Sequence, residues 1–146
     1  MSLKACIIPV TAFQQNCSLI WCDESMKGAF VDPGGEAERL IATAKENGVT
    51  IEKILVTHAH LDHAGAVADL AEQLNVPIEG PHKDDLFLVE SLPQQCEMYS
   101  FPPSRSFQPD RWLEGEDEVT VGNLTLTVRH CPGHTPGHVV FHEKGA

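Results

Sequence analysis

The chain has 146 residues, 42% of them hydrophobic, and a formal net charge of −11 with neutral histidines. This composition excludes collagen-like, coiled-coil and disordered proteins, and the length predicts one domain over residues 1–146, able to bury about two thirds of the surface that its unfolded chain exposes. The acidic balance disfavours nucleic acid and anionic membrane surfaces as partners, because both are bound through Lys and Arg.

The first half of the chain predicts alternating strands and helices. Strand-like runs lie at 3–10, 16–22, 29–32, 51–56 and 76–78. Apolar residues recur with the period of an amphipathic helix over 36–47 and over 64–74. The sequence Asp32-Pro33-Gly34-Gly35 predicts a turn after the third strand. This alternation indicates an α/β fold with helices packed on sheet faces.

The second half is less regular. Four prolines without a clear period predict a long surface loop over 92–112, either a lid or a simple connector. Acidic residues at 114–118 indicate a solvated turn before a hairpin of 119–121 and 124–128, joined through Gly122 and Asn123. A last short strand is expected over 139–142.

The cysteines and the N-terminal residues indicate the cellular compartment of the protein. The five cysteines have no C-x-x-C spacing, which fits neither a disulfide framework nor a zinc ribbon, so we expect Cys6 and Cys17 to be reduced and structural. The sequence has no apolar run of about 20 residues and no signal-peptide pattern at its N-terminus. It therefore predicts a cytoplasmic protein.

A cluster of metal-ligand residues follows the strand at 51–56, in the run His58-Ala59-His60-Leu61-Asp62-His63. Alternate residues of a strand point to the same side, so His58 and His60 can converge on one ion. The turn into the next helix brings Asp62 and His63 to a neighbouring point. Three imidazoles and a carboxylate so close together would repel or stay unsatisfied without a cation, so the cluster predicts a metal site.

A second cluster lies far along the chain, in Pro132-Gly133-His134-Thr135. The Pro-Gly pair forms a tight turn that can direct His134 inward, and neutral imidazole is a good zinc ligand. His134 completes a set of three histidines with His58 and His60. His130 and His138 flank this turn as neighbours of the site or as exposed residues, and no role is assigned to His82 or His142.

The H-x-H-x-D-H motif at 58–63 and the P-G-H-T motif at 132–135 resemble the metallo-β-lactamase superfamily, and in particular its glyoxalase II (hydroxyacylglutathione hydrolase) branch. Further support comes from the Asp-Pro-Gly-Gly turn at 32–35. The resemblance implies an αββα sandwich, of which this chain has the N-terminal part. It also implies that a metal-bound hydroxide hydrolyses a small thioester, one that is linked to glutathione.

The resemblance also assigns roles to single residues. It implies that His58, His60 and His134 bind a first metal, and that Asp62 and His63 bind a second, with Asp62 orienting the metal-bound water. Asp32 matches an aspartate that orients ligands or backbone beside the site. The implied cofactor is zinc, one or two ions, with iron or manganese as alternatives.

The sequence departs from the family after His134. A bridging aspartate and a last histidine are missing, together with the second half of the sandwich. A C-terminally incomplete domain explains this best, and a homo-oligomer in which another copy supplies the ligands is the alternative. Two other functions stay open: an iron-dependent sulfur (persulfide) dioxygenase of the same fold, and a non-catalytic metal-binding fragment.

Overall fold

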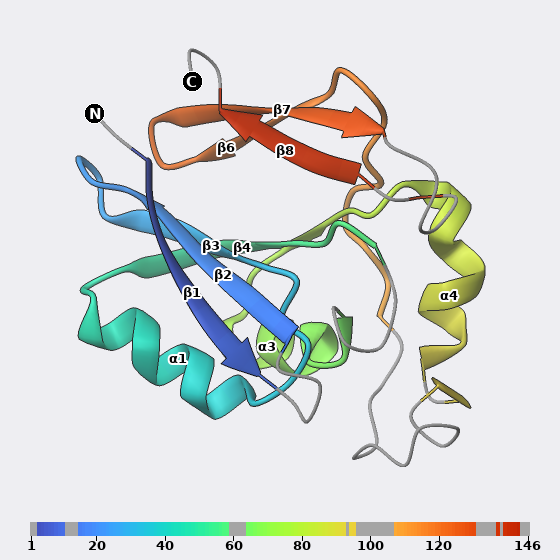
Figure 1. Cartoon of the computed structure of the whole chain (residues 1–146), viewed down its shortest axis with the longest axis horizontal. Helices are drawn as coiled ribbons and strands as arrows, with labels where there is room; N and C mark the ends of the chain where they lie inside the picture. The colour runs from blue at the N-terminus through green and yellow to red at the C-terminus, as the bar shows by residue number, and fades with distance from the viewer. Residues whose placement is uncertain are drawn as a thin grey trace.

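The computed structural model describes residues 3–10, 15–58, 64–92, 94–95, 107–130, 137 and 139–143. Within these residues the strands form two sheets (Figure 1). The larger sheet has the order β1-β2-β3-β4-β5, with bounds Leu3–Val10, Gln15–Cys22, Lys27–Val31, Thr50–Leu55 and Ile78–Glu79. The smaller has the order β6-β7-β8, with bounds Glu118–Val121, Leu124–His130 and Val139–Glu143.

The larger sheet is mixed. Strands β1, β2 and β3 pair antiparallel, whereas β3, β4 and β5 run parallel. The parallel connections pass through helices α1 (Ala37–Glu46) and α3 (Val67–Leu74), as parallel neighbours require. Both helices lie on the face of this sheet that points away from the smaller sheet (Figure 1). The layer order is helix, sheet, sheet, which confirms the predicted α/β class.

Two hydrophobic cores follow from the alternation of side chains along the strands. On β4, Ile54 packs in the core beneath the helices, and the next residue, Leu55, packs between the two sheets. Leu40 of α1 and Val67 of α3 are fully buried in the first core, which confirms the helical stripes predicted from the sequence. Among the described residues, no helix is long and apolar enough to cross a bilayer.

The structure confirms the predicted hairpin but describes only part of the predicted long loop. Strands β6 and β7 pair through the two-residue turn Gly122 and Asn123, as predicted, with Val121 opposite Leu124. The loop expected over 92–112 lies largely outside the described residues. Gln108, Asp110 and Arg111 are exposed, as expected, whereas Leu92 is fully buried and Phe107 is 8% exposed. Their apolar side chains join the core beneath the helices.

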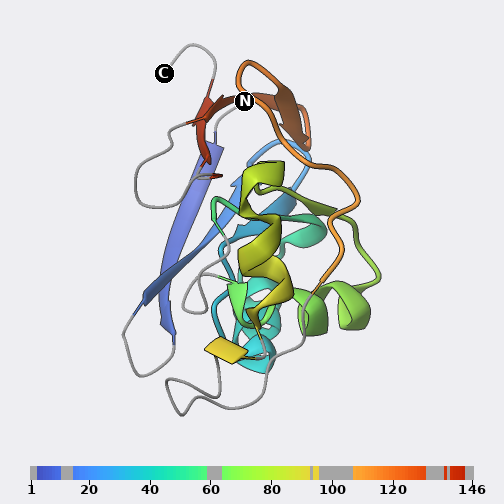
Figure 2. The same ribbon diagram turned by 90° about the vertical axis from the view of Figure 1, so that its right-hand side faces the viewer.

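A 3-10 turn, η1 (Lys83–Asp85), and helix α4 (Leu86–Glu90) were not expected from the sequence. The five residues of α4 are too few to show a helical period. In Figure 1 this helix stands beside the edge where β4 and β7 end and β8 begins, and Figure 2 looks onto that edge with α4 in front.

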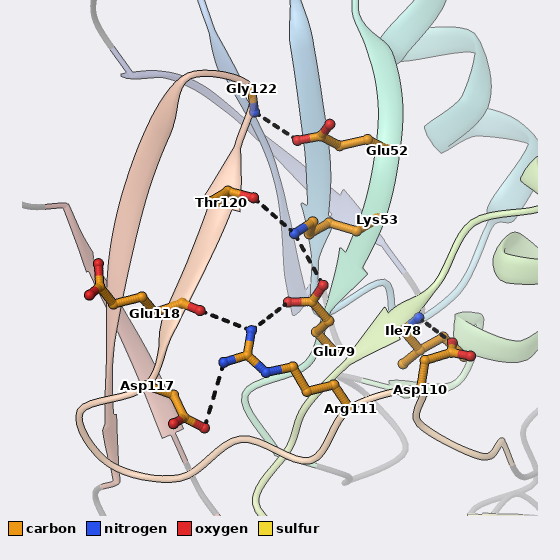
Figure 3. A network of polar contacts seen from close by, with 10 residues as sticks. All are labelled: Glu52, Lys53, Ile78, Glu79, Asp110, Arg111, Asp117, Glu118, Thr120 and Gly122. Carbon is orange, nitrogen blue, oxygen red and sulfur yellow. Dashed lines mark hydrogen bonds and ion pairs between the residues drawn. The ribbon is translucent and has the colours of Figure 1, made fainter.

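A network of charged side chains connects the two sheets (Figure 3). Lys53 of β4 pairs with Glu79 of β5 at 3.1 Å, and Lys53 Nζ also donates to Thr120 Oγ1 of β6 at 3.5 Å. Arg111 Nη1 lies 3.5 Å from Glu79 and donates to the carbonyl of Glu118 at 2.9 Å. The Lys53 and Glu79 side chains are only 11% and 13% exposed, so each buried charge is neutralised by its neighbour.

Candidate metal centre

The predicted site residues divide between described and undescribed parts of the chain. His58 and Asp32 are described, whereas His60, Asp62, His63 and His134 lie outside the described residues. The described residues that flank both histidine clusters, and the contacts of these residues, show the surroundings of the candidate site.

Asp32 begins the turn after β3 and is 6% exposed. Its backbone has a positive φ of 56°, a conformation that is costly for a residue with a Cβ. A backbone hydrogen bond to β4 helps to hold this conformation, because the Asp32 amide donates to the carbonyl of Leu55 at 2.9 Å. This conformation places the carboxylate at the carboxyl end of β4, where Oδ1 accepts from the Thr57 amide at 2.7 Å.

The hydroxyl group of Thr57 connects Asp32 to His58. The Thr57 hydroxyl donates its single proton to Asp32 Oδ2 at 2.5 Å. Toward His58 Nδ1, 3.0 Å away, the same oxygen can therefore only accept, so Nδ1 carries the ring proton. The tautomer that results places the lone pair of His58 on Nε2.

This tautomer fits a metal ligand. His58 is 3% exposed and its ring has further contacts, and its buried Nε2 atom makes no hydrogen bond with the residues that the structure describes. Metal-binding imidazoles typically coordinate through one nitrogen while the other donates to a neighbouring oxygen. The donor set at His58 thus suits zinc or another ion that binds imidazole.

Described residues that flank the two clusters meet at one edge. The amide of Val139, at the start of β8, donates to the carbonyl of Thr57 at 2.8 Å. Val139 lies five residues after His134, and Thr57 immediately precedes His58. On the other side of the first cluster, the Ala66 amide donates to the Pro33 carbonyl at 2.9 Å, so the turn at 32–35 contacts the chain on both sides of residues 59–63.

Cys17 lies near this edge but has the properties of a core residue. Its thiol is fully buried, and burial together with the negative charge of Asp32 raises the pKa of Cys17 far above its usual range. A buried, protonated thiol is a poor nucleophile. Cys17 is therefore structural, as the sequence indicated.

His82, Asp84 and His130 form a group that the sequence did not indicate, with potential ligand atoms within 4.8 Å of one another. The rings of His82 and His130 stack at a centroid distance of 3.9 Å and an interplanar angle of 5°. A zinc ion lies close to the plane of each ring that binds it, at about 2.1 Å from the nitrogen. Two parallel, stacked rings cannot both meet that condition for one ion, so this geometry favours packing over metal binding.

Comparison with family models matches residues 10–146 to the metallo-beta-lactamase superfamily. The chain belongs to this superfamily. Hydroxyacylglutathione hydrolase GloC of Haemophilus influenzae is 50% identical over 94% of this chain and 66% of the relative. The probable metallo-hydrolase YqgX of Bacillus subtilis is 30% identical over 95% of this chain and 65% of the relative. The chain thus spans just under two thirds of these relatives.

Solved structures of the superfamily superpose closely on the chain. The BLEG-1 B3 metallo-beta-lactamase has a TM-score of 0.82 and is 31% identical, covering 98% of this chain and 68% of that one. TTHA1623 in a di-iron-bound form also has a TM-score of 0.82 and is 34% identical, covering 94% of this chain and 66% of that one. The metallo-beta-lactamase fold predicted from the two motifs is confirmed.

Proposed function

We propose that this protein is a metal-dependent hydrolase that cleaves S-(2-hydroxyacyl)glutathione or a related small thioester. The observation that carries the proposal is the 2.8 Å bond between Val139 and Thr57, which joins the chain beside the P-G-H-T motif to the chain beside the H-x-H-x-D-H motif. The similarity to a relative named hydroxyacylglutathione hydrolase supports the substrate class.

The proposed ligands are His58, His60 and His134 for a first ion and Asp62 and His63 for a second, with zinc as the metal. Such an ion, when bound, supplies Lewis acidity that lowers the pKa of water and polarises the thioester carbonyl. We further propose that Asp62 orients the attacking water.

The chain's own contribution is orientation. Asp32 holds the Thr57 amide and hydroxyl, and Thr57 holds the ring proton of His58 on Nδ1. Nε2 is thereby ready to bind without a change of tautomer. Metal activation of water requires no side-chain nucleophile, which agrees with the inert Cys17 thiol.

The proposal is tested by metal analysis and thioester hydrolysis on the purified protein. We expect bound metal, release of free thiol from S-(2-hydroxyacyl)glutathione, and loss of both on treatment with a chelator. Zinc, iron and manganese are restored separately to the metal-free protein to identify the active ion. His58→Ala should lower the metal content and remove hydrolysis, whereas His142→Ala, outside both motifs, is the control.

Three other experimental results would each reject one part of the proposed function. Bound metal without turnover of any thioester would reject the hydrolase and favour a non-catalytic metal-binding protein. Oxygen consumption with a persulfide, dependent on iron, would favour the dioxygenase. Metal content unchanged in His58→Ala would reject the site itself.

A further inference from the structure

Gly137 lies three residues after His134 and is held on both sides of its backbone by the segment 82–85. Its amide donates to Asp85 Oδ1 at 2.7 Å, and its carbonyl accepts from the His82 amide at 3.1 Å. A Cβ at position 137 would lie 2.5 Å from the Asp85 amide nitrogen and 2.7 Å from the His82 carbonyl oxygen. The contact is so close that glycine is required at this position.

The same segment contacts the chain before the P-G-H-T motif. His130, the last residue of β7, stacks its ring on that of His82 at 3.9 Å. His82 Nδ1 in turn accepts from the Asp84 amide at 3.1 Å, which fixes the orientation of its ring. Residues 131–136 are therefore bracketed by two contacts with one short turn, His130 on one side and Gly137 on the other.

Asp85 is unusual because its side chain is fully buried. Burying a carboxylate is costly unless hydrogen bonds compensate, and an apolar residue would fill such a position at lower cost. The charge-assisted bond to Gly137 gives this carboxylate a specific task. Three residues span at most about 11 Å, so the position of Gly137 restricts where His134 can lie.

We propose that Asp85 is a positioning residue for the metal centre: it holds Gly137 and thereby restricts the chain that carries His134, three residues earlier. This inference rests on the proposed metal site but not on the identity of the substrate. Asp85 itself acts through the backbone and touches neither metal nor substrate.

The test compares Asp85→Ala with Asp110→Ala. Asp110 is exposed and controls for loss of the hydrogen bond: its Oδ2 also accepts a backbone amide at 2.7 Å, that of Ile78, but in the region of the inter-sheet network (Figure 3). Metal affinity is measured by competition with a chromophoric zinc chelator. Amide hydrogen exchange of peptides covering 131–138 is followed by mass spectrometry on the metal-free protein.

We expect Asp85→Ala to weaken zinc binding 10- to 100-fold, the range typical for residues that orient metal ligands. Exchange in 131–138 should accelerate in the same variant. Asp85→Asn, which keeps the acceptor oxygen, should restore most of the affinity. Asp110→Ala should leave both readouts unchanged, even where it lowers the free energy of unfolding.

Zinc affinity of Asp85→Ala equal to that of the original protein, or an equal loss in both alanine variants, would overturn the proposal. If Asp85→Ala does not fold, Gly137→Ala provides the second variant and should produce the same two changes. Metal binding without thioester turnover in the original protein would reject the proposed substrate and leave this test valid.

Discussion

Two clusters of buried polar side chains contact β4, and different interactions hold them: ion pairs in one cluster and hydrogen bonds in the other. In the network between the sheets, Lys53 meets Glu79, and Glu79 meets Arg111, so opposite charges cancel. At the carboxyl end of the strand, Asp32 accepts hydrogen bonds from the neutral amide and hydroxyl of Thr57. The first arrangement joins the two sheets, whereas the second orients the ring of a candidate metal ligand, His58.

The largest expected effect is on stability and belongs to the network. Glu79→Gln removes the charge that compensates the buried Lys53, and we expect a loss of about 2–4 kcal/mol in the free energy of unfolding, measured with urea. Zinc affinity should be unchanged. The double variant Lys53→Met, Glu79→Gln should recover part of the loss, and a loss below about 1 kcal/mol in the single variant would contradict the assignment.

A matched pair of substitutions separates the two regions. Thr57→Val removes the hydroxyl between Asp32 and His58 while keeping the shape of the side chain, so we expect zinc affinity to fall 10- to 100-fold. Thr120→Val removes the hydroxyl that accepts from Lys53 and should leave zinc affinity unchanged. Chelator competition measures both.

Thr57→Ser is the rescue variant, because serine keeps the hydroxyl. Its affinity should lie close to that of the original protein. Equal affinities in Thr57→Val and Thr120→Val would show that the hydroxyl does not determine the state of the His58 ring.

The smallest expected effect is at the surface. Arg129 and Glu116 form an ion pair with side chains 49% and 76% exposed. Glu116→Gln should change the free energy of unfolding by less than about 1 kcal/mol, because solvent screens exposed pairs. A larger change by urea denaturation, or one that persists at high salt, would show that charge compensation matters here as it does at Lys53.

Local patterns in the sequence predicted much of the fold. The stripe that includes Leu40 predicted α1, and the pair Gly122 and Asn123 predicted the hairpin, because both depend on residues close together in the chain. The family resemblance at 58–63 and 132–135 predicted the superfamily. The contact between the chain beside His134 and the chain beside His58 joins residues more than 70 positions apart, and the sequence alone could not measure it.

The residue types that can bind a metal, and the strand end on which His58 lies, follow from local patterns along the chain. Which groups support that site depends on contacts between distant parts of the chain. The stack of His82 on His130, the bond from Gly137 to Asp85 and the path from Asp32 through Thr57 to His58 each depend on how strands and turns meet in space. The physical reason is that hydrogen bonding and charge compensation act between neighbours in space, whereas periodicity reports only neighbours along the chain.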